Sequence, residues 1–459
     1  MNKLLTSLLA TALAVSACSP SESEIQEAQD LKFDASNPFF VESDLYLKIP
    51  AFDKINNEHY APAFEAGMSL HLAEVDVIAN NPEPVTIDNT LIALENSGAV
   101  LDRVSSVFFA LASADLNDEI DALRGEMAPK LSAHSDSILL NGKLFKRVKA
   151  LYEQLDSMKV DAETARLVSE TYKDFVRLGA DLSDADKEKL KAMNSTLATL
   201  QTQFTQNVQK EVNAKAIIVE SKDQLAGLSD AQIASAELAA KSRDLEGKYV
   251  LPLLNTSGQP SMSSLSNRAL RERIHKTSLG RGSSGGEFDN REILSKIARL
   301  RAQRAQLMGF ANHAAYSLSN KTAQTTKAVN DRLAILTPPA VANAKREAAD
   351  LQKQIDAEGG DFQLASWDWS YYTEKVRAQR YNFDESQLKP YLEMENVLVN
   401  GVFYAAEQVF GITFKERPDL KTYHPDVKVW EVFDADGSTL ALFIQDFYAR
   451  ESKRGGAWM

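Results

Sequence analysis

Apolar residues recur at three- and four-residue steps along much of the chain beyond residue 37, and this spacing predicts a mainly α-helical protein. One helix is predicted to begin at Asp161 and to end at Gly179, with its apolar residues on one face. A longer helix is predicted to follow Ser183-x-x-Asp186, which has the form of a capping box. Its apolar stripe does not keep a heptad period, so it predicts a core-facing helix rather than a coiled coil.

Four short apolar runs depart from the helical spacing of apolar residues, and strands are predicted there instead of helices. Residues 216–219 and 249–254 are short apolar runs with β-branched residues, and they predict two small strands. Residues 427–433 and 440–447 are two further apolar runs, separated by the turn-forming sequence Asp434-Ala435-Asp436-Gly437. We therefore expect a β-hairpin close to the C-terminal end of the sequence.

Two segments are expected to interrupt the regular structure. Pro338 and Pro339 lie inside a helical pattern over residues 328–357 and should end or kink that helix. The stretch 282–286 reads Gly-Ser-Ser-Gly-Gly, which could be a phosphate-binding loop. It lacks the Gly-Lys-Ser/Thr ending and the preceding strand of such loops, so a flexible surface loop is the better interpretation.

The first residues have the features of an export signal. Lys3 precedes a short apolar run over residues 4–15, and Val15-Ser16-Ala17-Cys18 resembles a lipoprotein cleavage site. We expect a signal peptide over residues 1–17, lipidation of Cys18 as a membrane anchor, and a flexible polar tether over 18–36. The protein would then be an exported bacterial lipoprotein that faces the periplasm. The alternative is an ordinary signal peptide with an incidental cysteine.

Composition narrows the function classes. The 459 residues are 44% hydrophobic and 25% charged, which is ordinary for a globular protein with a substantial core. The net charge of −13 argues against a nucleic-acid partner, because phosphate binding needs clustered lysines and arginines. Cys18 is the only cysteine, and no Gly-x-Ser-x-Gly motif occurs, so a cysteine or serine hydrolase is disfavoured.

The six histidines give no metal-binding pattern in the sequence. His134 lies on a predicted helix, and we interpret it as a packed or capping residue rather than a ligand. No two histidines are close enough in sequence to share a helical turn. They are His59, His71, His134, His275, His313 and His424.

Several phrases in the second half of the sequence are distinctive. They are Trp367-Asp368-Trp369-Ser370-Tyr371-Tyr372, His424-Pro425-Asp426-Val427, Asp446-Phe447-Tyr448-Ala449-Arg450 and Lys453-Arg454-Gly455-Gly456-Ala457-Trp458-Met459. These phrases resemble the thimet oligopeptidase family of zinc metallopeptidases, which includes oligopeptidase A and peptidyl-dipeptidase. The resemblance extends from about Asn37 onward and is strongest after the predicted hairpin.

This resemblance implies a mainly α, two-lobed metallopeptidase fold with a small β-sheet near the C-terminus. It implies an N-terminal helical lobe over residues 37–225 and the start of a catalytic domain over 226–459. The catalytic lobe would be incomplete. A narrow channel would admit short peptides, and an edge strand of the sheet would hold them in extended form. The residues with a possible place in the channel are Tyr371, Tyr372, Gly455, Gly456 and Trp458. A monomer is expected.

In the family that this chain resembles, zinc is bound by His-Glu-x-x-His, in which two imidazoles share one helix face and the glutamate acts on the metal-bound water. This motif does not occur in the 459 residues. We therefore expect a zinc oligopeptidase truncated before its zinc helix, which has no peptidase activity and folds incompletely in this form. The alternative is a non-catalytic helical lipoprotein that binds peptides.

Overall fold

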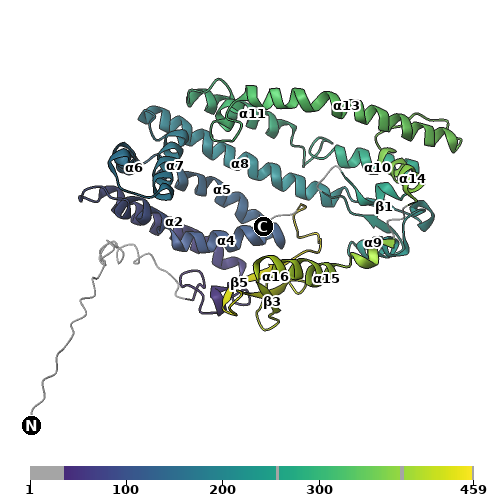
Figure 1. The fold of residues 1–459 in the computed structure, drawn as a ribbon, viewed down its shortest axis with the longest axis horizontal. Helices are drawn as coiled ribbons and strands as arrows, with labels where there is room; N and C mark the ends of the chain where they lie inside the picture. Colours follow the sequence, from purple (N-terminus) through teal and green to yellow (C-terminus); the bar gives the residue numbers. More distant parts are fainter. Residues whose placement is uncertain (1–35, 255–257, 383–386, 457–459) are drawn as a thin grey trace, which may run out of the picture. The chain divides into compact units, whose positions relative to one another are not determined.

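A computed structural model describes residues 36–254, 258–382 and 387–456. The predicted signal peptide and Cys18 therefore lie outside the described residues, as does the predicted tether apart from residue 36. Trp458 also lies outside them. The fold is mainly helical with small antiparallel sheets, one of them near the C-terminal end, which confirms the predicted fold class (Figure 1). In the part of the chain described here, no helix is long and apolar enough to cross a bilayer.

The chain forms two units. Unit 1 contains the residues up to Glu42, then Asn56–Phe108 and Lys130–Ala192, and unit 2 contains Ser43–Ile55, Phe109–Pro129 and everything from Met193 onward. The boundary expected between residues 225 and 226 therefore falls inside unit 2. Helices α4 and α5 contribute residues to both units.

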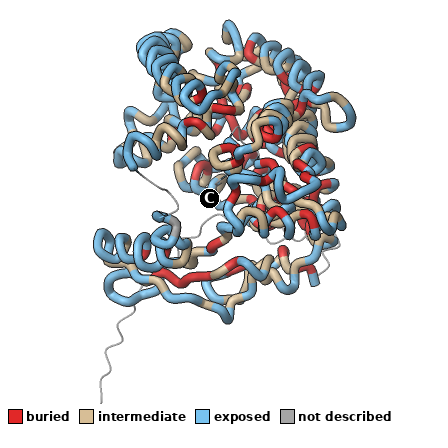
Figure 2. Tube along the Cα trace, turned by 90° about the vertical axis from the view of Figure 1, so that its right-hand side faces the viewer, coloured by how far each residue is buried: buried red, intermediate tan, exposed pale blue. Residues whose placement is uncertain are grey.

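The helices of the first half are α2 (Tyr60–Asn80), α3 (Ala93–Glu95), α4 (Ala99–Ala114), α5 (Asp118–Leu139), α6 (Gly142–Gln154), α7 (Ala162–Leu178) and α8 (Asp184–Ala214). Those of the second half are α9 (Asp230–Lys241), α10 (Arg268–Leu279), α11 (Arg291–Leu307), α12 (His313–Leu318), α13 (Thr326–Ala357), α14 (Trp369–Tyr381), α15 (Met394–Val397) and α16 (Tyr404–Phe410). A π-helical turn, η9 (Leu398–Phe403), joins α15 to α16. Figure 2 shows that most helices carry buried residues on one side and exposed residues on the other.

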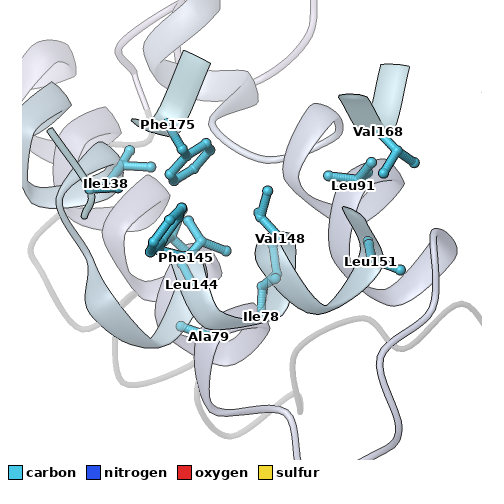
Figure 3. Close-up of a cluster of buried hydrophobic side chains, with 12 residues drawn as sticks. Ile78, Ala79, Leu91, Ile138, Leu144, Phe145, Val148, Leu151, Val168 and Phe175 are labelled. Atoms are coloured by element: carbon cyan, nitrogen blue, oxygen red, sulfur yellow. The ribbon is translucent and has the colours of Figure 1, made fainter. Parts of the chain in front are cut away.

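Helix α7 begins and ends where its sequence predicts. The Asp161 carboxylate accepts a hydrogen bond from the Thr164 N–H at 2.7 Å, and Gly179 ends the helix in the left-handed conformation with φ of 106°. The apolar face of α7 packs into the core of unit 1, where Phe175 lies near Phe145 of α6 and Val168 lies beside Leu91 (Figure 3). Burial of this shared face holds the helices of unit 1 together.

Unit 2 contains both sheets. Strands β1 (Ile217–Val219) and β2 (Tyr249–Leu251) form within the apolar runs that predict them, and they pair antiparallel. The second sheet has the order β3-β4-β5, with β3 at Thr413–Glu416, β4 at Lys428–Phe433 and β5 at Thr439–Gln445. Strands β4 and β5 form the predicted hairpin. The sequence did not predict β3, which pairs with the other side of β4.

The two prolines Pro338 and Pro339 were expected to end or kink a helix, but helix α13 does not end there. It continues from Thr326 to Ala357 with both prolines inside. A proline removes one helical N–H and leaves a carbonyl one turn earlier without its partner. Residues 331–347 are all exposed, so water can satisfy these carbonyls and the helix tolerates the loss.

The glycine-rich loop at 282–286 is more firmly held than a flexible loop. The buried Glu211 of α8 accepts hydrogen bonds from the Gly282 N–H and the Ser284 hydroxyl. The Gly282 carbonyl in turn accepts from the Asn290 N–H at 2.7 Å. A carboxylate 71 residues away thus fixes the loop, and the composition of the loop alone gives no sign of it.

Candidate functional site

Strand β4 is the centre of the C-terminal sheet, and an aromatic cluster anchors one of its faces. Trp430 packs against Phe403 of η9 with ring centroids 4.9 Å apart, and Phe403 stacks on Phe414 of β3 at 3.9 Å. The Trp430 Nε1–H donates to the Gln445 Oε1 at 2.8 Å, which links β4 to the end of β5. Trp430 therefore stabilises all three strands against the helices of this layer.

A polar cluster around Glu431 holds the next position of β4. The buried Glu431 carboxylate accepts hydrogen bonds from the Tyr46 hydroxyl, from Arg417 at 2.8 Å and from Thr439 at 2.8 Å. The hydrogen bond from Tyr46, reinforced by Arg417 and Thr439, lowers the pKa of Glu431 despite its burial. Arg417 also lies over the Tyr46 ring, 4.6 Å from its centroid. The cluster ties the segment Ser43–Ile55 to the sheet.

Strand β5 is the edge of this sheet within the described residues. It pairs with β4 on one side, and no described strand pairs with its other side. Its sequence, Thr-Leu-Ala-Leu-Phe-Ile-Gln, contains no charged residue and no proline, the features that commonly protect an edge from pairing. Leu440 is 56% exposed and Ile444 is also exposed. This edge is chemically able to accept an extended peptide.

The segment after β5 is folded around Asp446. Its carboxylate accepts two hydrogen bonds from Arg450, at 2.8 and 2.7 Å, and one from the Tyr423 hydroxyl at 2.8 Å. It also forms an ion pair with Lys453 at 2.9 Å. Burial alone would raise the pKa of Asp446, but these donors outweigh it and the pKa lies far below the usual range. The carboxylate therefore stays ionised and holds the turn after β5 in one conformation.

Backbone hydrogen bonds then dock this segment on the end of α4. The Leu116 N–H donates to the Ser452 carbonyl and the Arg454 N–H donates to the Ser113 carbonyl, both at 2.8 Å. Two exposed glycines follow, Gly455 and Gly456, and Gly456 has a φ of 106°. A Cβ at Gly456 would meet no other atom within 4 Å, so its conformation and not crowding favours glycine here.

The structure places the other residues of the predicted channel in a packed cluster. Tyr372 is buried against Leu351 and Ile355 of α13, and Tyr371 is half-buried beside it. The Arg271 guanidinium lies 4.1 Å from the centroid of the Tyr371 ring. A contact of these tyrosines with peptide stays a prediction.

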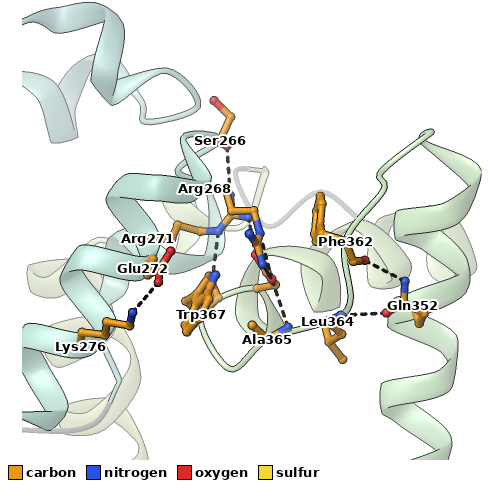
Figure 4. A network of polar contacts seen from close by, with 11 residues as sticks. Ser266, Arg268, Arg271, Glu272, Lys276, Gln352, Phe362, Leu364, Ala365 and Trp367 are labelled. Atoms are coloured by element: carbon orange, nitrogen blue, oxygen red, sulfur yellow. Dashed lines mark hydrogen bonds and ion pairs between the residues drawn. The ribbon is translucent and has the colours of Figure 1, made fainter.

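Beneath these tyrosines lies a buried ion cluster, shown in Figure 4. Asp368 is fully buried, Arg271 is 1% exposed, and Arg268 is 34% exposed. The Asp368 carboxylate accepts from Arg268 at 2.9–3.2 Å, from Arg271 at 2.9 Å and from the Ala365 N–H at 3.1 Å. Burial opposes ionisation, but these donors lower the pKa of Asp368. The cluster joins α10 to the start of α14.

Comparison with known proteins identifies the chain as a peptidase relative. The model for peptidase family M3 matches residues 261–459. The chain is 43% identical over 423 residues to the dipeptidyl carboxypeptidase of Escherichia coli, covering 92% of this chain and 62% of that protein. It is 32% identical over 417 residues to the E. coli oligopeptidase A, covering 90% and 61% respectively. The chain is thus similar to peptidases of family M3. It spans about three fifths of the length of these curated relatives.

The residues of this chain do not fit the zinc site implied by the resemblance. The motif His-Glu-x-x-His is absent from all 459 residues. Among the residues with described positions, no three His, Cys, Asp or Glu side chains are gathered so that they could hold a metal ion. The described residues therefore present a sheet edge suited to peptide backbone, and they gather no donor set for a metal ion.

The polar partners of the sheet were not predicted from the sequence. Tyr46 and Glu431 are 385 residues apart, and nothing near Tyr46 indicates that its hydroxyl reaches a strand. A signal was present in β4, where Glu431 interrupts the apolar run Trp430 to Phe433. A carboxylate inside such a run must be hydrogen-bonded when the strand is buried on both faces.

Proposed function

We propose that this chain is the peptide-binding part of a zinc-dependent peptidase that hydrolyses peptide bonds in short peptides. Similarity to peptidase family M3 over residues 261–459 supports the reaction class, and relatives named dipeptidyl carboxypeptidase and oligopeptidase A support peptides as the substrates. The observation that carries the binding role is strand β5, an unprotected and partly apolar edge on a well-anchored sheet.

An edge strand binds an extended peptide through its backbone N–H and C=O groups, which every peptide offers in the same pattern. Affinity then depends little on the peptide sequence, and exposed side chains such as Leu440 and Ile444 add apolar contact. A rigid edge loses less conformational entropy on binding. Trp430 and Glu431 on β4 and Asp446 after β5 supply that rigidity.

We further propose that the 459-residue chain binds short peptides without hydrolysing them. This follows from the absence of the His-Glu-x-x-His donors from the sequence. Export and anchoring through lipids on Cys18 stay predictions from the first residues of the sequence.

Peptide binding by the chain tests the role of β5. A fluorescent hexapeptide should bind in polarisation measurements, and the same peptide N-methylated at alternate amides should bind about tenfold more weakly, because it loses donors to the edge. Leu440→Lys should also weaken binding, since a charge on an edge strand opposes pairing. The matched control is Leu333→Lys on α13, where the leucine is 53% exposed, close to the 56% of Leu440. Equal affinity for the plain and N-methylated peptides would contradict backbone pairing.

A further inference from the structure

A pair of histidines lies in unit 1. His71 of α2 and His134 of α5 are hydrogen-bonded, with the His134 Nε2 3.0 Å from the His71 Nδ1. The other ring nitrogen of His71, Nε2, lies 3.1 Å from the Ser97 Oγ. The Ser97 hydroxyl donates to the Leu94 carbonyl at 2.6 Å. His134 is buried, with 8% of its surface exposed.

These contacts determine where the protons lie. The single hydroxyl proton of Ser97 points at the Leu94 carbonyl, so the Ser97 oxygen must accept from an Nε2–H of His71. The neutral His71 then has a bare Nδ1, which accepts from the Nε2–H of His134. The His134 Nδ1 is consequently also bare. It is buried and has no hydrogen-bond partner among the described residues.

A proton added to this chain of groups has no favourable position. On the His134 Nδ1 it creates a buried N–H without an acceptor. A proton on the His71 Nδ1 would face the Nε2–H of His134, so two N–H groups would point at each other. If His134 changes tautomer to avoid this, its N–H moves to the buried Nδ1, which has no acceptor among the described residues. Each arrangement also puts a positive charge inside the helical packing, where desolvation is costly.

The charges that face the pair offer little compensation. Glu74 of α2 is the carboxylate that favours protonation of His71, but it accepts the Gly98 N–H at 2.6 Å. Lys130 of α5, one turn before His134, is paired with Glu65 of α2 at 3.1 Å. The Ser97–Gly98 turn brings no charged side chain. Burial, with the charge of His71 acting in the same direction, lowers the pKa of His134 to about 4. Burial also lowers the pKa of His71, against the opposing charge of Glu74.

The Ser97–Gly98 turn packs closely against the His71 ring. A Cβ at Gly98 would lie 2.8 Å from the His71 Nδ1, so the turn before α4 packs directly on this ring. Gly98 has a φ of 81°, which a glycine adopts without strain. The pair thus connects three segments: α2, α5 and the Ser97–Gly98 turn.

We propose that the His71–His134 pair is an acid-sensitive latch that holds α2, α5 and the Ser97–Gly98 turn together at neutral pH and releases them in mild acid. Because the folded-state pKa of His134 lies below the unfolded value of about 6.5, the unfolded chain binds more protons between about pH 6.5 and pH 4. The stabilisation is therefore complete above that window and is lost as the pH falls through it.

Hydrogen exchange of α2 and α5 at pH 7 and pH 5 tests the latch. The opening equilibrium of these helices in the unaltered chain should increase about twentyfold between the two pH values because of His134 alone. His134→Gln keeps a donor to His71 and removes the titrating ring, so this increase should largely disappear. His275→Gln, which removes a histidine of unit 2, should leave it unchanged. An equal pH dependence in the His134→Gln variant and the unaltered chain would overturn the proposal.

A second measurement uses only the unaltered chain, so it does not depend on whether a variant folds. In the unaltered chain with isotope-labelled histidines, the His134 ring should carry its proton on Nε2 at pH 7 and titrate well below pH 6. A titration near pH 6.5, or a proton on Nδ1 at neutral pH, would contradict the latch.

Discussion

Replacing Trp430 by alanine should lower the free energy of unfolding of unit 2 by about 3–5 kcal/mol, as large-to-small changes at buried tryptophans do. The change removes the contact with Phe403 and the hydrogen bond to Gln445 together. Because these contacts fix β5 to β4, peptide binding at the edge should weaken as well. Denaturant unfolding and the polarisation assay measure the two effects.

Trp430→Phe is the matched control for this prediction. Phenylalanine keeps an aromatic ring against Phe403 but cannot donate to the Gln445 side chain, so a loss of about 1–2 kcal/mol is expected, with part of it from the orphaned amide oxygen. An alanine variant within 1 kcal/mol of the unaltered chain would show that the aromatic cluster does not anchor the sheet.

Replacing Asp368 by alanine should cost about 3–5 kcal/mol, because it leaves the buried Arg271 without its counter-charge. Arg268→Ala should cost less, since Arg268 is partly exposed and Asp368 keeps Arg271. The control is Asp331→Ala, which breaks an exposed pair with Lys327 and should change stability by less than about 1 kcal/mol. Equal losses for Asp368→Ala and Asp331→Ala would contradict the role of the buried cluster.

Local sequence signals predicted much of the fold. Helix α7 is bounded by Asp161 and Gly179 as expected, because cap chemistry acts over three or four residues. The hairpin of β4 and β5 was predicted because its turn residues and apolar runs are adjacent in sequence. The family resemblance also came from contiguous phrases, and the comparisons confirm it.

Features that depend on distant residues could not be predicted in this way. The loop at 282–286 is held by Glu211, which lies on another helix. His71 and His134 are 63 residues apart and meet only because α2 packs beside α5. Spacing along one helix cannot reveal such a pair, so the six histidines gave no pattern. The interpretation of His134 as a packed residue agrees with its burial, but its hydrogen-bond partner was missed.

The continuation of α13 through Pro338 and Pro339 shows the limit of a local rule. A proline costs a helix its hydrogen bond, but an exposed stretch can replace that bond with water. Long-range packing at the C-terminal end of α13, where Leu351 and Ile355 meet Tyr372, then stabilises the helix. Tertiary contacts decided this element against its intrinsic propensity.

Hydrolysis of a short peptide most directly tests the proposal that this chain is the peptide-binding part of a zinc-dependent peptidase. The 459-residue chain would be compared with the same chain joined to the C-terminal part of the E. coli dipeptidyl carboxypeptidase that follows the matched region. We expect the joined protein, once shown to be folded, to cleave a fluorogenic peptide, to lose activity with a chelator and to regain it with zinc. The 459-residue chain should bind the peptide and leave it intact. Chelator-sensitive cleavage by the 459-residue chain alone, or a folded joined protein that cleaves nothing, would contradict the account.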